Sequence, residues 1–136
     1  MLKENLNSFK NLISAQNPTL GIDVDGCIDE SPMFFSVLTQ SWAGKVFIVS
    51  MRSNIFDLEI LLKDKNIRYD EIFLVKKMQE KAEVIKENGI SVFIDDQPEV
   101  LKHIPDTVSV MLFRNGGNFH YGEKKWMFSN DTGLIY

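Results

Sequence analysis

The sequence predicts an α/β protein, a three-layer α/β/α sandwich around a five-stranded parallel sheet. Five short runs rich in Val, Ile and Phe alternate along the chain with segments of helical spacing. This alternation favours parallel strands, because parallel strands need crossover connections and their sheet is buried under helices on both faces. At 136 residues with 44% apolar content, the chain fits a single domain with an ordinary core.

The expected strands are short, apolar and rich in β-branched or aromatic residues. They are residues 19–24, 45–50, 71–75, 91–95 and 108–113. Four segments with helical periodicity lie between or beside them, at residues 32–43, 54–66, 78–89 and 98–104. Gly44 and Gly89 stand where the first and third of these helices are expected to stop.

The two ends of the chain differ from its core, residues 18–113. Residues 1–17 carry apolar side chains at helical spacing and are expected to form an amphipathic helix that ends near Pro18. This helix either packs on the domain or offers its apolar face to a second copy or another partner. Residues 114–136 form an aromatic tail with several glycines, which favours a loop with a short hairpin or helix.

The composition excludes several kinds of site. A single cysteine, Cys27, rules out a disulfide framework and a cysteine-rich zinc site, and His103 and His120 leave little for a histidine-based one. Any metal would therefore be held mainly by carboxylates, which suit hard cations and Mg²⁺ first. The formal charge of -4 argues against a broad electrostatic surface for nucleic acid, while a local basic pocket is compatible with it.

The hydropathy pattern gives no sign of a membrane protein. No apolar run approaches the roughly 18 residues of a membrane span, and the first residues lack the apolar core of a signal peptide. A cytoplasmic protein with no membrane partner is therefore expected.

Polar side chains follow three of the expected strands at the point where each strand ends. Asp23 and Asp25 lie at the end of the first strand, Ser50 lies at the end of the second, and Asp95 and Asp96 lie at the end of the fourth. Because ligands of open α/β sheets bind outside the carboxyl ends of the strands, these groups are expected to converge on one site. Lys76, Lys77 and Lys81 lie between the third and fourth strands, and at least one of them can reach the same edge.

Each of these signals has an ordinary structural explanation when it is taken alone. An Asp after a strand is often a helix cap or a turn former, and Asp95 and Asp96 precede a helix that could begin at Pro98. As a group they are harder to explain without a ligand. Clustered carboxylates raise one another's pKa values, whereas a divalent cation would hold them ionised.

Four ordered segments carry a family resemblance. They are DVDGCID from Asp23, FIVSMR ending at Arg52, a lysine in KKMQEK, and FIDDQPEV from Phe93. Together they resemble the four motifs of the haloacid dehalogenase-like (HAD) phosphohydrolase superfamily, over residues 19–102. The resemblance implies a magnesium-dependent phosphomonoester hydrolase that acts through an aspartyl-phosphate intermediate.

The resemblance also implies roles for the residues of the first two motifs. Asp23 would be the nucleophile, and Asp25 would be the general acid and base, with its backbone carbonyl on the metal. Gly26 would let the chain turn sharply away from the strand beside the substrate. Ser50 would donate a hydrogen bond to a non-bridging phosphate oxygen.

The later motifs would supply the lysine and the rest of the metal shell. Lys81 is the favoured lysine, because it lies before the fourth strand as in relatives of this superfamily; Lys77 follows as a substrate-binding candidate, and Lys76 comes last. Asp95 and Asp96 would complete the magnesium shell, one of them directly and the other through water.

The sequence leaves two alternative roles for each of two further residues, Arg52 and Cys27. Arg52 resembles an arginine often found after the second motif and could orient the substrate; a surface cation is the alternative. Cys27 stands where this superfamily often has threonine and is either a buried spectator thiol or a redox-sensitive group.

The spacing of the motifs leaves no room for a cap domain, since the intervening segments are filled by the expected helices and strands. The resemblance then implies an open site that takes the phosphorylated end of a macromolecule, or a small molecule covered by an oligomer or by the tail. A nucleotide or nucleic acid end is the first expected substrate. The tail aromatics either stack on it or pack against the sheet edge; they are Phe119, His120, Tyr121, Trp126 and Phe128.

Two other functional classes share some of these features. Phosphoacceptor signalling modules combine acidic groups, a hydroxyl and a lysine on a parallel sheet, but their acidic pair follows the first strand and a lone Asp follows the third. Here the DxD pair comes first and the adjacent pair comes last. A HAD-like scaffold that binds a partner without turnover is the second alternative.

Overall fold

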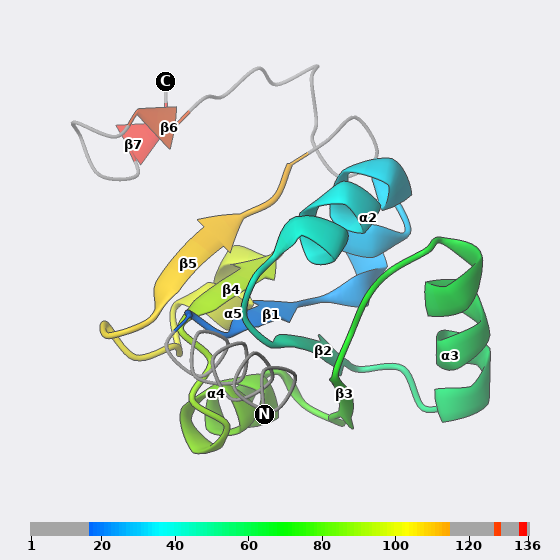
Figure 1. The fold of residues 1–136 in the computed structure, drawn as a ribbon. Coiled ribbons are helices and arrows are strands. Elements are labelled where there is room, and N and C mark those ends of the chain that lie inside the picture. Colours follow the sequence, from blue (N-terminus) through cyan, green and yellow to red (C-terminus); the bar gives the residue numbers. More distant parts are fainter. Residues whose placement is uncertain (1–16, 115–126, 129–133, 136) are drawn as a thin grey trace, which may run out of the picture.

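The central sheet contains five parallel strands in the order β3-β2-β1-β4-β5, as a computed structural model of the chain shows (Figure 1). The structure describes residues 17–114, 127–128 and 134–135. The strands are β1 (Leu20–Ile22), β2 (Val46–Ser50), β3 (Glu71–Leu74), β4 (Val92–Asp95) and β5 (Ser109–Leu112). All five strands expected from the sequence are present, and the α/β fold class is confirmed.

Four helices connect these strands within residues 17–114. They are α2 (Pro32–Ser41), α3 (Ile55–Asp64), α4 (Met78–Glu87) and the short α5 (Pro98–Leu101). An irregular turn, η1 (Val24–Ile28), lies between β1 and α2. In the tail, β6 (Met127–Phe128) pairs antiparallel with β7 (Leu134–Ile135). The helix expected over residues 1–17 and most of the tail aromatics lie outside the described residues.

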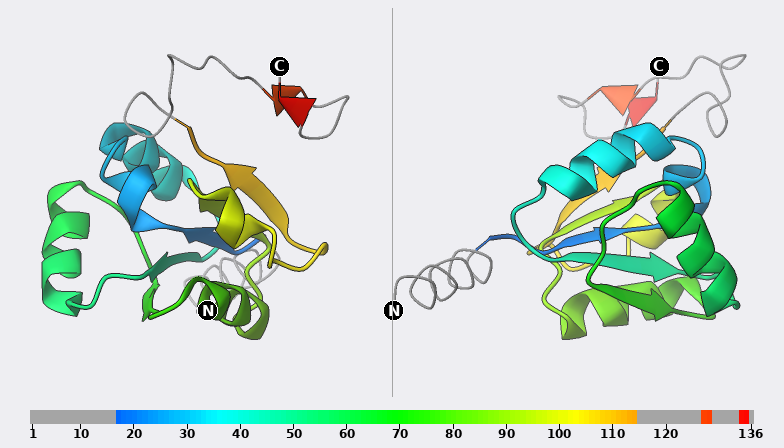
Figure 2. Two further views of the ribbon diagram at one scale, coloured as in Figure 1. Left: turned by 180° about the vertical axis from the view of Figure 1, so that it is seen from behind. Right: turned by 45° about the vertical axis from the view of Figure 1, so that its right-hand side comes forward.

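The strand side chains divide between two apolar cores, one on each face of the sheet. Along β2, Val46 and Ile48 join the core shared with α2 and α3, while Phe47 and Val49 join the core shared with α4 and α5. Alternate side chains of a strand point to opposite faces, so a strand apolar at every position must be covered on both. Figure 2 shows helices above and below the sheet, the arrangement of a three-layer sandwich.

Local sequence accounts for some helix ends and not for others. Asn54 caps α3 through its side-chain oxygen, which accepts from the backbone N–H groups of Phe56 and Asp57. Gly89 follows α4 with a φ of 63°, as expected for a glycine that ends a helix. Gly44 differs, because α2 ends at Ser41 and a side chain at Gly44 would collide with the Pro18 carbonyl.

The order of the strands indicates where a ligand site is expected. From β1, the strands β2 and β3 are added on one side of the sheet, and β4 and β5 are then added on the other side of β1. Ligands of open α/β sheets bind at the carboxyl ends of the strands that flank such a reversal, here β1 and β4. A ligand site is therefore expected among the residues that follow these two strands.

Within residues 17–114 the connections between strands hold only the helices and turn named above, so no cap domain is evident. None of the helices among the described residues combines the length and hydrophobicity needed to cross a bilayer.

Candidate active site

Asp23 follows β1 directly, at the end of the strand where the strand order reverses. Its backbone N–H donates to the Ile94 carbonyl at 3.0 Å, which keeps the residue in register with β4 beyond the end of β1. Its exposed fraction is only 5%. A carboxylate buried at this depth needs a specific partner, because burial without compensation is costly.

A tight turn carries the chain away from Asp23. The backbone angles of Asp25 (φ -73°, ψ 125°) and Gly26 (φ 84°, ψ -9°) are those of a type II turn, which requires positive φ at its third residue. The Gly26 N–H donates to Asp29 Oδ1 at 2.8 Å and so fixes the turn. A Cβ at Gly26 would collide with the carboxylate of Asp96.

We therefore expect Gly26→Ala to be damaging for two separate reasons, the positive φ and the collision with Asp96. Gly89→Ala is the matched control, because Gly89 also has positive φ but a Cβ there would meet no atom within 4 Å. The control should lose about 1 kcal/mol of unfolding free energy from backbone strain alone. Thermal melts should show a clearly larger loss of stability for Gly26→Ala. Equal losses for the two variants would show that contact with Asp96 does not restrict the residue at position 26.

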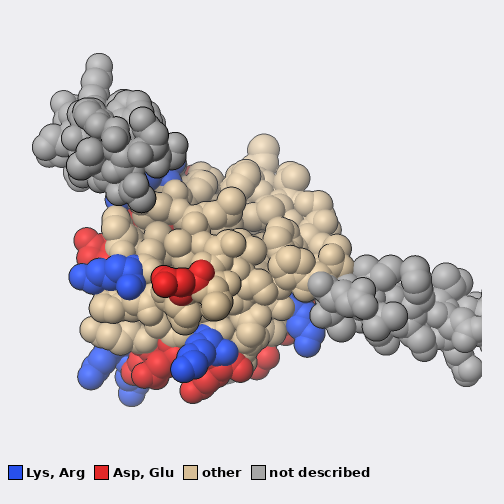
Figure 3. Space-filling model, turned by 90° about the vertical axis from the view of Figure 1, so that its left-hand side faces the viewer, with Lys and Arg blue, Asp and Glu red and all other residues tan. Residues whose placement is uncertain are grey.

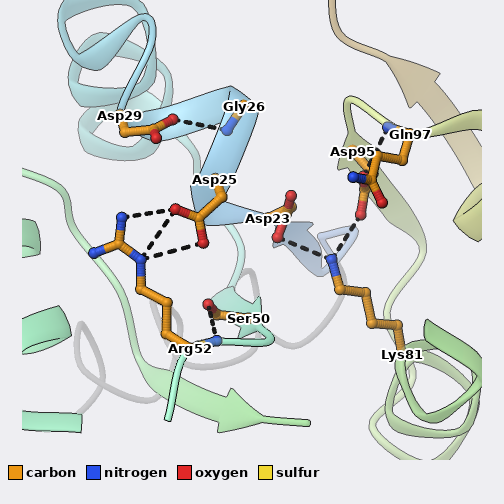
Figure 4. A network of polar contacts seen from close by, with 9 residues as sticks. All are labelled: Asp23, Asp25, Gly26, Asp29, Ser50, Arg52, Lys81, Asp95 and Gln97. Atoms are coloured by element: carbon orange, nitrogen blue, oxygen red, sulfur yellow. Dashed lines mark hydrogen bonds and ion pairs between the residues drawn. The ribbon is translucent and has the colours of Figure 1, made fainter. Parts of the chain in front are cut away.

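Lys81 joins the carboxylates at the ends of β1 and β4. Its Nζ donates to Asp23 Oδ1 and to Asp95 Oδ2, both at 2.9 Å, and its exposed fraction is 3% (Figure 4). The other oxygen of Asp95 accepts from the backbone N–H of Gln97 at 2.9 Å. Asp95 is thus fully buried and held on both oxygens, whereas Lys81 holds only one oxygen of Asp23.

The buried charges shift one another's pKa values. Burial, together with the nearby Asp95 charge, raises the pKa of Asp23 to about 7, although Lys81 opposes this rise. Burial disfavours the charged form of Lys81, but the charges of Asp23 and Asp95 outweigh it and raise the lysine pKa above its usual value. The ammonium is therefore retained as the counter-charge of this cluster.

Ser50, the last residue of β2, and Arg52, two residues later, lie on the other side of Asp23 (Figure 4). Ser50 is fully buried, and its Oγ accepts from the backbone N–H of Arg52 at 3.1 Å, so its own hydroxyl proton is left to donate. The Arg52 guanidinium contacts the carboxylate of Asp25, with Nη2 to Oδ1 at 2.7 Å. Figure 4 shows Arg52 and Lys81 on opposite sides of Asp23.

Asp96 turns toward Asp23 and carries the one side-chain oxygen among the described residues that is buried without a hydrogen-bond partner, Oδ1. Asp23, Cys27 and Asp96 each offer a ligand atom, and these atoms lie within 4.8 Å of one another. Burial and the Asp23 charge raise the pKa of Cys27, which keeps the thiol protonated and disfavours a soft metal. Two carboxylates remain, a donor set that suits a hard cation such as Mg²⁺ when other oxygen ligands complete its shell.

A cleft of about 460 Å³ opens beside Asp96. Its walls come from the start of α4, the loop between β4 and α5, the start of α5 and the segment that follows β5. The lining residues are Met78, Asp96, Gln97, Pro98, Glu99 and Arg114. A group bound at the carboxylates could extend into this space.

Some of the candidate residues contact one another in the structure, and others do not. Lys81 contacts Asp23 and Asp95, whereas Lys76 and Lys77 are exposed, with Lys77 at the cap of α4. Of the acidic pair after β4, Asp96 faces Asp23 while Asp95 is bound by Lys81 and the chain itself.

Three features of the site were not predicted from the sequence. The Gln97 N–H that binds Asp95 is a backbone group and leaves no signal in the residue type. Asp29 fixes the Gly26 turn, and its spacing three residues after Gly26 is the only hint of this. The pairing of Arg52 with Asp25 joins two segments far apart in the sequence.

No protein-family model matches the chain, and no curated protein matches it either.

Proposed function

We propose that the protein is a magnesium-dependent phosphomonoester hydrolase of the HAD-like type, in which Asp23 carries the phosphoryl group. The observation that supports this most is the burial of Lys81 between Asp23 and Asp95, at the point where the strand order reverses. A buried ammonium that holds one oxygen of a carboxylate leaves the other oxygen oriented for attack on phosphorus.

The remaining groups fit the transfer of a phosphoryl group to Asp23. Ser50 can donate its hydroxyl proton to a non-bridging phosphate oxygen, and the Lys81 ammonium reduces the repulsion between Asp23 and the incoming anion. Asp25 is the group suited to protonate the leaving alcohol and then to accept a proton from the hydrolytic water. Its side chain is 55% exposed, at the mouth of the site where a leaving group would emerge.

The carboxylates of Asp23 and Asp96 would hold the magnesium ion, together with the backbone carbonyl of Asp25 that the resemblance implies. The unpartnered Asp96 Oδ1 and the absence of a side chain at Gly26 leave this position open to a cation. When bound, Mg²⁺ would neutralise phosphate charge during the transfer. Asp95, held by Lys81, would act as the orienting neighbour of Lys81.

We infer that the substrate is a phosphomonoester presented to an open site, with a nucleotide or nucleic acid end as the first candidate. No cap closes over the site within residues 17–114, which leaves room for a bulky leaving group. A long nucleic acid track is less favoured: acidic side chains lie among the basic ones on the face seen in Figure 3. The net charge of -4 argues in the same direction.

The affinity for Mg²⁺ should fall as the pH falls below about 7. The pKa of Asp23 is raised to about 7, so this carboxylate is mainly protonated below that pH and a proton then competes with the metal. We expect the rise in melting temperature caused by Mg²⁺ to be larger at about pH 8 than at about pH 6. A metal-induced rise that is the same at both pH values would contradict the metal assignment to Asp23.

The function is tested by phosphate release from nucleotides, sugar phosphates and a chromogenic phosphomonoester, each with Mg²⁺ and with chelator. Release that requires Mg²⁺ and continues over many turnovers is the expected result. The second candidate, a HAD-like or phosphoacceptor module without turnover, is favoured by the open site; it would bind Mg²⁺ but release no phosphate from any compound.

A further inference from the structure

Both oxygens of the Asp25 carboxylate are engaged by Arg52. Nη2 of Arg52 donates to Oδ1 at 2.7 Å, and Nε donates to Oδ1 and Oδ2, both at 3.2 Å (Figure 4). Arg52 is more basic than an ordinary arginine, because its hydrogen bond to Asp25 raises its pKa. The cation is therefore permanent, and only a change of position can release Asp25.

The position of Arg52 links this ion pair to the phosphate site. The Arg52 backbone N–H is fixed to Ser50 Oγ at 3.1 Å, so the arginine begins beside the hydroxyl assigned to the phosphate. Its side chain has an exposed fraction of 30%, and a dissolved anion can reach it. The guanidinium thus contacts the Asp25 carboxylate, while the backbone of the same residue lies beside the hydroxyl proposed to bind phosphate.

The ion pair conflicts with the work assigned to Asp25. A carboxyl group that exchanges a proton with the leaving group must turn toward that group, yet Arg52 holds both of its oxygens. Exposed ion pairs contribute little free energy, so the pair can exchange partners at small cost. A phosphate dianion offers the guanidinium a stronger bidentate partner than a carboxylate does.

We propose that Arg52 restrains Asp25 in the resting protein and moves to the phosphoryl oxygens of the incoming substrate, which frees Asp25 to face the leaving group. This inference rests on the proposed function for the role of Asp25, but the exchange of partners can be measured without turnover. Arg52 is then a positioning residue for Asp25, responsive to a dianionic phosphoryl group. Among residues 17–114 no cap domain closes over the site. The phosphoryl group of the substrate would itself release Asp25 from Arg52.

The exchange is tested with inorganic phosphate as the probe, in the presence of Mg²⁺. The dissociation constant is measured by calorimetry for the wild type, Asp25→Asn, Arg52→Gln and the double variant. Removal of the Asp25 charge also reduces direct repulsion of phosphate, and this contribution is the same whether or not Arg52 is present. Competition for Arg52 makes Asp25→Asn tighten phosphate binding more when Arg52 is present than when it is absent.

We expect Asp25→Asn to tighten phosphate binding about fivefold more in the wild-type background than in the Arg52→Gln background. Equal effects in the two backgrounds would mean that Arg52 does not exchange partners. Weaker phosphate binding by Asp25→Asn would mean that Arg52 holds both groups at once. Absence of phosphate binding in every variant would overturn both the exchange and the phosphate site.

Matched controls come from Asp64 and Lys65, an exposed ion pair at the far end of α3. Asp64→Asn and Lys65→Gln make the same changes of charge without touching the site and should leave the phosphate affinity within twofold of the wild type. In turnover of a chromogenic phosphomonoester, Arg52→Gln should raise KM more than it lowers kcat. A loss confined to kcat would overturn the exchange, while absence of turnover with an intact thermodynamic coupling would refute only the enzymatic role.

Discussion

Asp23→Asn should abolish phosphomonoester turnover, with a loss of at least about 10⁴-fold, because the amide keeps the shape of the side chain but removes the oxygen that we propose as the nucleophile. The fold should survive. The pKa of Asp23 is already raised to about 7, so the neutral amide resembles the form that is half populated at neutral pH. The measurements are initial rates with Mg²⁺ and a thermal melt of the same preparation.

The control for Asp23→Asn is Asp64→Asn, which removes an exposed carboxylate at the end of α3. It should retain the wild-type rate. If Asp23→Asn kept most of its activity while its melt stayed normal, Asp23 would not be the nucleophile. A variant that failed to fold would show instead that Asp23 is required as the counter-charge of Lys81.

Lys81→Met should have the largest effect on stability. It leaves Asp23 and Asp95 buried without their shared cation, and removal of one partner from a buried ion pair costs about 3–5 kcal/mol. Phosphate release should also fall by at least about 10²-fold, since the positive charge that we propose to stabilise the transferred phosphoryl group is lost. Chemical denaturation at neutral pH measures the first effect, and initial rates measure the second.

The pH dependence of this loss identifies its cause. Without Lys81, the main group that opposes the rise that burial imposes on the pKa of Asp23 is lost, so the folded state binds more protons than the unfolded state and the variant gains stability as the pH falls from about 7 to 5. Lys86→Met, an exposed change on the same helix, should alter stability by no more than about 0.5 kcal/mol. A deficit that did not shrink with pH would indicate lost packing rather than lost charge.

The layers of the fold could be predicted because the sequence pattern is local. A strand such as β2, apolar at successive positions, is recognisable without its neighbours, and its burial on both faces follows from helices on either side. Gly44 shows where this reasoning fails. Its position after a helical segment suggested a helix stop, but its small size is required by contact with Pro18, far away in the sequence.

The site could be predicted as a set of residue types but not as a set of contacts. Strand ends place Asp23, Ser50 and the pair after β4 at one edge whatever the details. Neighbouring side chains point in different directions, so the sequence could not say whether Asp95 or Asp96 would meet Lys81. The family resemblance favours Lys81, which does contact Asp23 and Asp95, but the residue pattern alone does not identify it. Which lysine enters the site depends on how α4 packs on the sheet, and that depends on the whole second core.

The most direct test of the central claim is to locate the phosphoryl group after reaction. Wild type and Asp25→Asn are mixed with Mg²⁺ and a chromogenic phosphomonoester, quenched in acid, digested and analysed by mass spectrometry. We expect phosphate on Asp23, with more of it in Asp25→Asn because hydrolysis of the intermediate is slowed. Turnover without a modified Asp23 in either protein, or a phosphoryl group on another residue, would contradict the proposed mechanism.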